Sequence, residues 1–149
     1  MTVTGDVVLA RLRRFLIGLS GLILAGTIVE LLLEEHYQEP IQFVPFALCI
    51  VGALVAGMAF FRPNRGSLRA LRASMIVIGL GGGIGATIHL IENFEFEREV
   101  HATADFITQL FNAVKGAAPL FAPGIMTFAA LIALAAAYYH PAFRSSEAG

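Results

Sequence analysis

The sequence predicts an all-α integral membrane protein, built as a four-transmembrane-helix up-down bundle with both termini in the cytoplasm. Hydrophobic residues make up 57% of the 149 positions and charged residues only 14%, whereas a soluble domain is about half apolar and a quarter charged. The apolar excess falls into four blocks, residues 15–33, 41–61, 73–91 and 120–139. Each block has about 20 residues, enough to cross roughly 30 Å of hydrocarbon. We therefore expect a single membrane domain over residues 1–149.

The distribution of charge predicts the orientation of these spans. Eight of the ten basic residues lie before the first block, between the second and third, and after the fourth: Arg11, Arg13, Arg14, Arg62, Arg65, Arg69, Arg72 and Arg144. Most acidic residues follow the first and third blocks: Glu34, Glu35, Glu39, Glu92, Glu95, Glu97, Glu99 and Asp105. Because arginine-rich short loops stay in the cytoplasm, we expect an inner (cytoplasmic) membrane protein of bacterial type with both acidic connections outside.

We expect the first block to be a retained span, since its apolar run exceeds the roughly 7–15 residues of a signal-peptide core. The lone Cys49 lies inside the second block and is expected to be a small packing residue. A shift of 58 positions aligns Arg11 with Arg69 and Glu34 with Glu92. The two hairpins are therefore either a duplication or two independent hairpins that obey the same charge rule.

The second outer connection, residues 92–118, is too long for a tight loop and should have structure of its own. Its apolar residues recur at helical spacing: Phe106, Ile107, Leu110, Phe111 and Val114. Polar residues lie around and between them. The pattern predicts a short amphipathic helix that lies on the membrane surface or caps the bundle.

The glycine-rich sequence GLGGGIG at residues 79–85 runs directly into the carboxylate-rich segment. It has no strand before it and no lysine after it, so it does not indicate a phosphate-binding loop. Gly81 and Gly85 are four residues apart, and this spacing predicts a close contact between two helices.

Six ionisable residues near the outer ends of the first and third blocks are candidate metal ligands: Glu30, Glu34, His36, His89, Glu92 and Glu95. The two blocks run in the same direction, so these side chains could converge. Imidazole and carboxylate ligands suit zinc, iron, manganese or copper. The simpler interpretation, which we favour, is a hydrogen bond between His89 and a carboxylate such as Glu30, because buried polar groups normally pair. Haem is not expected, since both histidines lie near the rim.

The function favoured by the sequence is a non-catalytic accessory subunit that assembles with itself or with a larger membrane complex. The alternative is a four-helix bundle with an outward-facing His/Glu site for a metal or cofactor. Transport of protons or cations past Glu30 would need a polar path that the second and fourth blocks do not supply. Nucleic-acid binding is not expected, because the arginines follow membrane orientation and lack interleaved aromatic residues.

Overall fold

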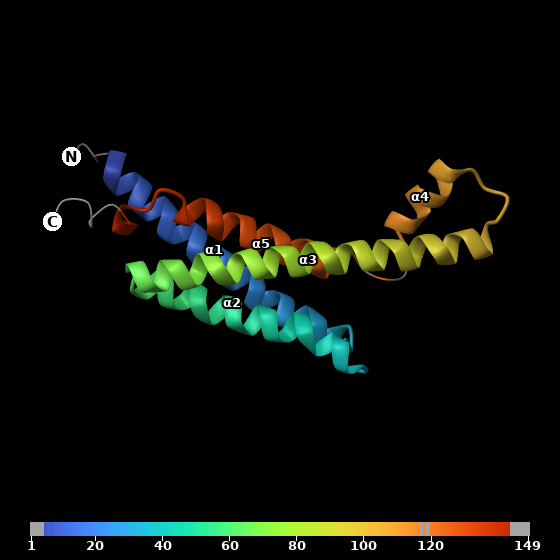
Figure 1. Ribbon diagram of the computed structural model, residues 1–149, viewed down its shortest axis with the longest axis horizontal. Coiled ribbons are helices and arrows are strands. Elements are labelled where there is room, and N and C mark those ends of the chain that lie inside the picture. The colour runs from blue at the N-terminus through green and yellow to red at the C-terminus, as the bar shows by residue number, and fades with distance from the viewer. Residues whose placement is uncertain (1–4, 117, 119, 144–149) are drawn as a thin grey trace.

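The computed structural model describes residues 5–116, 118 and 120–143, and these contain helices and turns but no strand. The helices in chain order are α1 (Gly5–Leu33), η1 (Pro40–Gln42), α2 (Phe43–Phe61), α3 (Arg65–Val100), α4 (Phe106–Val114), α5 (Phe121–Ala137) and η2 (Pro141–Phe143) (Figure 1). The prediction of an all-helical chain is confirmed over this range.

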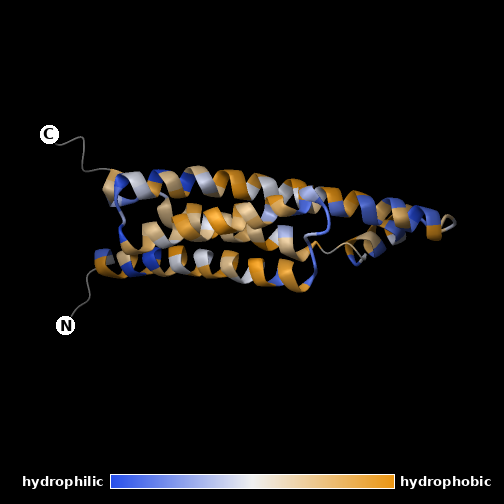
Figure 2. Cartoon of the chain, turned by 90° about the horizontal axis from the view of Figure 1, so that it is seen from below, coloured by the Kyte–Doolittle hydropathy of each residue, from blue (hydrophilic) through white to orange (hydrophobic). Residues whose placement is uncertain are grey.

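Three segments are long and apolar enough to cross a membrane, namely Gly5–Leu33, Pro40–Phe61 and Arg65–Val100, and Phe121–Ala137 is a shorter apolar helix. The last helix stops before residue 139 because Tyr138 adopts an extended backbone and Tyr139 has a φ of 47°. The apolar helices indicate a membrane protein. Figure 2 shows hydrophobic residues along most of their length and hydrophilic ones gathered toward their ends.

The helical core consists of α1, α2, α5 and the part of α3 that packs on them. Helix α1 contacts α2 and α5, and α3 contacts α2 and α5. The start of α1, the α2–α3 turn and η2 lie at one end, and the α1–α2 turn lies at the other (Figure 1). Small residues dominate the buried face of α5, including Ala129, Ala130 and Ala133. The Ser20 hydroxyl of α1 donates to the Ala129 carbonyl oxygen across 2.8 Å, so this buried polar group ties two helices together.

Helix α3 is longer than predicted at both ends. At its start, Asn64 and Ser67 form reciprocal side-chain to backbone hydrogen bonds, each 3.0 Å long, which is a capping arrangement that begins a helix. At its other end the charged residues after Glu92 were expected to form a loop, but the helix continues to Val100. Glutamate and arginine are good helix formers and the segment contains no proline or glycine. The predicted loop therefore begins only at His101.

Among the glycines of α3, Gly82 comes closest to α5, whereas the prediction named Gly81 and Gly85. A Cβ atom on Gly82 would lie 2.5 Å from both the Pro123 carbonyl oxygen and Thr127 Oγ1. A Cβ on Gly85 would lie 3.2 Å from Pro123 Cβ, and one on Gly81 would meet the Leu48 side chain of α2. The glycine-rich segment thus serves two helix contacts, and only Gly82 faces backbone at close range.

Arginines fix the end of α5. The Arg72 guanidinium donates to the Ala137 carbonyl oxygen across 2.6 Å, and Arg13 donates to the Tyr139 carbonyl oxygen across 3.3 Å. Arg65 donates to the Ala142 carbonyl oxygen across 2.8 Å. The bond from Arg72 reaches a carbonyl group that the end of α5 leaves without an intrahelical partner, and the other two bonds hold carbonyl groups of the segment after α5. The arginines that predicted orientation also hold the C-terminal segment against α1 and α3.

We predict that Gly82→Ala destabilises the protein by about 1–3 kcal/mol, the usual effect of forcing an extra methyl group into a packed contact. Gly83→Ala is the matched control, because no atom lies within 4 Å of a Cβ at that position. The measurement is the thermal unfolding midpoint of each purified variant in the same detergent. Equal midpoints for both variants would contradict the close α3–α5 contact.

Candidate functional site

A cleft of about 510 Å³ opens at the end of the core that carries the α1–α2 turn. Its walls come from α1, the turn after it, η1, α2, α3 and the first turns of α5. Five of the six predicted candidates line this cleft: Glu30, Glu34, His36, His89 and Glu92. Glu95 does not line it. The expected convergence of α1 and α3 side chains therefore holds for the residues up to Glu92, and Glu39 and Gln42 join them.

The two histidines face each other across the cleft. The centroids of the His36 and His89 rings lie 6.3 Å apart, with the rings at 71° in an edge-on arrangement. Burial lowers the pKa of His36 below its usual value, and the nearby charge of His89 lowers it further. Because burial and the neighbouring positive charge both disfavour the charged form, His36 stays neutral at pH values where a free imidazole would already be charged.

The expected hydrogen bond between Glu30 and His89 is absent among the described residues. The Nδ1 atom of His89 instead lies 3.3 Å from an oxygen of Glu92, one turn further along the same helix. This pair is partly open to solvent, since the Glu92 side chain is 58% exposed. Glu30 lines the cleft half-buried and makes no ion pair within the described part of the chain.

The cleft residues do not form a coordination set. Over residues 5–116, 118 and 120–143, no group of three or more His, Cys, Asp or Glu side chains is arranged to hold a metal ion. The described geometry therefore brings the candidate ligands into one cleft without bringing three of them around one point.

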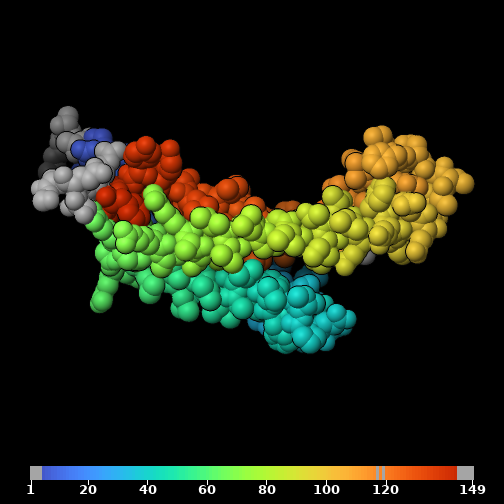
Figure 3. Space-filling view, viewed as in Figure 1, coloured from blue at the N-terminus to red at the C-terminus, as the bar shows by residue number. Residues whose placement is uncertain are grey.

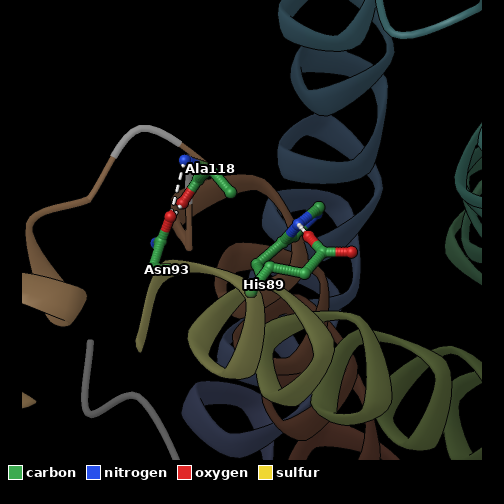
Figure 4. A network of polar contacts seen from close by, with 4 residues as sticks. His89, Asn93 and Ala118 are labelled. Carbon is green, nitrogen blue, oxygen red and sulfur yellow. Dashed lines mark hydrogen bonds and ion pairs between the residues drawn. The ribbon is translucent and has the colours of Figure 1, made fainter. Parts of the chain in front are cut away.

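The second feature with functional character is the projection, defined as residues 93–116. It comprises the last turns of α3, a short connection and α4, and it stands clear of the other helices (Figure 3). Its base is fixed by Asn93, a side chain only 5% exposed. Asn93 Nδ2 donates to the Ala118 carbonyl oxygen and the Ala118 N–H donates to Asn93 Oδ1, both across 2.9 Å (Figure 4). The chain that returns toward α5 is thus tied to α3.

Further polar contacts hold α4 against α3. Gln109 donates to the His101 carbonyl oxygen across 3.0 Å, and Asn112 donates to a Glu97 carboxylate oxygen across 3.2 Å. The same Glu97 oxygen lies 2.9 Å from Nδ1 of His101. Asp105 caps the start of α4 by accepting hydrogen bonds from Thr108 and Ile107, and these bonds lower the pKa of its carboxyl group. Side-chain hydrogen bonds therefore hold α4 in place against the end of α3.

Helix α4 presents its apolar residues outward. Phe106, Ile107 and Phe111 are 63%, 69% and 61% exposed, whereas Gln109 and Ala113 are the buried residues of this helix. A helix that only covered the core of this chain would bury its apolar face instead. The predicted amphipathic helix is confirmed in position. The Phe106 ring lies edge-on to Phe94 of α3, with the ring centroids 5.6 Å apart, and Ile107 and Phe111 remain exposed.

The charge of the projection is negative. Residues 93–116 contain four carboxylates, Glu95, Glu97, Glu99 and Asp105, against two cations, Arg98 and Lys115, which gives a net charge of −2 with His101 neutral. The Lys115 ammonium group lies 4.1 Å from the centroid of the Phe111 ring. The exposed apolar residues of α4 thus belong to a projection of net negative charge, in which the cation Lys115 lies over Phe111.

No known protein family, curated protein or solved structure matches the chain. The class of protein is therefore defined by the molecule itself, as a small, all-helical protein with helices apolar enough to span a membrane.

Sequence reasoning missed the residues that hold the two features in place. Asn93 and Gln109 were polar residues in an apparently polar loop, and Gly82 was one of several adjacent glycines. One signal was present for Asn93: it follows the apolar block at helical spacing from His89, on a helix that nothing in the sequence interrupts.

We predict that His89→Gln raises the pKa of His36 toward its ordinary value, because it removes the neighbouring imidazolium while the burial of His36 remains. The readout is an NMR titration of the His36 ring proton between about pH 5 and 8, where imidazoles titrate. His101→Gln, on the projection, is the control and should leave the His36 titration unchanged. A His36 pKa that does not respond to His89→Gln would show that the rings are not neighbours.

Proposed function

We propose that the protein is a non-catalytic accessory subunit of an inner-membrane assembly, with four membrane spans forming an up-down bundle and both termini in the cytoplasm. In this proposal the projection lies on the outer side and docks a protein partner through the apolar face of α4. The observation that carries the proposal is that α4 is fastened to α3 through Gln109 and Asn112 while Phe106, Ile107 and Phe111 remain exposed. A preformed apolar surface lowers the ordering cost of binding.

The arrangement of charged groups supports the orientation. The arginines of α1 and of the start of α3 gather at the end where the α2–α3 turn and η2 lie (Figure 1). Apart from Asp6 in the first turn of α1, the carboxylates of the described residues lie toward the opposite end and on the projection. Short, arginine-rich connections favour the cytoplasmic side, so the projection is assigned to the outside.

Charge also favours a protein partner over the alternatives. An acidic projection lacks the clustered lysines and arginines that attract a segment to anionic lipids. Two copies of the projection would each bring a net charge of −2 to a shared interface, and like charges disfavour such pairing. A partner that offers an apolar groove with a basic rim complements both the exposed phenylalanines and the net negative charge of the projection.

The orientation predicts a labelling pattern. After replacement of Cys49 by alanine, single cysteines at Glu39 and Glu99, both exposed, should react with a membrane-impermeant thiol reagent in intact cells. A cysteine at the exposed Pro63 should react only after the cells are opened. The reverse pattern would place the projection in the cytoplasm and contradict the proposed topology.

The docking role predicts a position-specific crosslink. A photoreactive benzoylphenylalanine at Phe111 should give one discrete protein adduct in cells, because that side chain faces the partner. The same residue at Thr103, an exposed position in the connection of the projection, is the matched control and should give none. Adding Ile107→Asp to the Phe111 probe should abolish the adduct by placing a charge within the apolar face.

Mass spectrometry of the Phe111 adduct decides the outcome. A different protein as the crosslinked species supports the proposal. Adducts with lipid alone, with a second copy of this chain, or equally strong adducts from Phe111 and Thr103 would each contradict docking of a protein partner by α4.

A further inference from the structure

The cleft between the α1–α2 hairpin and α3 combines an apolar interior with an acidic rim. Its apolar lining includes Leu31, Leu48, Ile84, Ile88 and Met126. Its carboxylates are Glu30, Glu34, Glu39 and Glu92, and neither lysine nor arginine is among the described residues that line it. A ligand that fits such a surface has an apolar body and a cationic group.

The position of the cleft points to the membrane as the source of that ligand. Its mouth carries apolar side chains that are open to the surroundings, with Ile41 69% and Ile84 62% exposed. These residues lie on α3 and next to the start of α2, within segments that are apolar enough to span a membrane. The carboxylates lie where α1 ends and the polar turn begins. In the proposed topology, this is the depth of the outer lipid headgroups.

The polar groups of the cleft that lack a partner among the described residues indicate which lipid headgroup fits. Glu92 is shared with His89, but Glu30 and Glu34 make no ion pair within the described residues and face the cleft. An ammonium group would supply the N–H donors that these carboxylates lack. His36 and Gln42 also line the cleft, and their N–H groups are donors of the kind that phosphate oxygens accept.

We propose that this cleft binds an aminophospholipid of the outer leaflet, with its ammonium group at Glu30 and Glu34, its phosphate beside the His36 imidazole and the upper part of its acyl chains over the apolar wall. The proposal rests on the membrane topology proposed above and is independent of docking by α4. It makes the cleft a lipid site, in which neither Glu95 nor the projection takes part.

The test is native mass spectrometry of the detergent-purified, delipidated full chain titrated with phosphatidylethanolamine or phosphatidylglycerol of identical acyl chains. Wild-type protein should bind the amine lipid about tenfold more tightly, the effect of a charge-assisted hydrogen bond. The Glu30→Gln, Glu34→Gln double variant should lose most of this preference. Glu95→Gln removes a carboxylate of α3 that lies outside the cleft, and this variant should retain the preference.

A second comparison on unaltered protein guards against a variant that fails to fold. Phosphatidylcholine carries the same charges but has no N–H donors on its nitrogen, so wild-type protein should bind it more weakly than phosphatidylethanolamine. Dodecylamine, a soluble amphiphilic amine, should compete only weakly, because it lacks the phosphate.

Several outcomes would overturn the proposal. Equal binding of the ethanolamine and glycerol lipids would exclude recognition of the amine, and a preference retained in the double variant would place the site elsewhere. Displacement by dodecylamine at concentrations lower than the lipid itself requires would identify a free amine as the ligand. Failure of the labelling pattern with lipid preference intact would overturn the topology alone.

Discussion

The two hydrogen bonds between the Asn93 side chain and the Ala118 backbone determine how the second half of the molecule is arranged. Asn93 is buried on α3 and uses both its amide nitrogen and its carbonyl oxygen on one residue of the returning chain. A buried amide without such partners would cost about 1–3 kcal/mol. With the connection fixed at this point, α5 starts at Phe121 beside α3, and α4 is held back along the end of α3 instead of extending away from it.

The helical core follows a different constraint, because helices in lipid gain little from hydrophobic association and depend on close packing. Gly82 allows the α5 backbone to approach α3, and the alanines of α5 allow α1 to approach from the other side. Ser20 and Arg72 then pair with backbone carbonyl oxygens of the α5 region. The same helix faces thus provide both the close packing and the hydrogen-bond partners of the buried polar groups. The cleft lies between the α1–α2 hairpin and α3, and carboxylates and exposed isoleucines line it.

Periodicity and composition were sufficient to predict the helical class, the helix at Phe106–Val114 and the convergence of Glu30, Glu34 and His89 on one side of the core. They did not predict where α3 ends, because glutamates after residue 92 are as compatible with a helix as with a solvated loop. Nor did they select Gly82 over Gly81, since a rotation of one residue, about 100° on a helix, decides which glycine faces α5. The sequence also could not decide which carboxylate would pair with His89, because that depends on distances between side chains. The partner is Glu92, on the same helix.

Helix α4 is a fixed surface rather than a loose helix. Nine residues alone are too few for a stable helix in water, so any protection of α4 must come from Asn93, Gln109 and Asn112 and their partners. Hydrogen exchange of the intact protein in lipid nanodiscs measures this directly. We predict that the α4 amides are protected in the wild type and lose protection in Asn93→Ala, while α1 and α2 are unchanged. Wild-type α4 amides that exchange as fast as those of an unstructured peptide would contradict it.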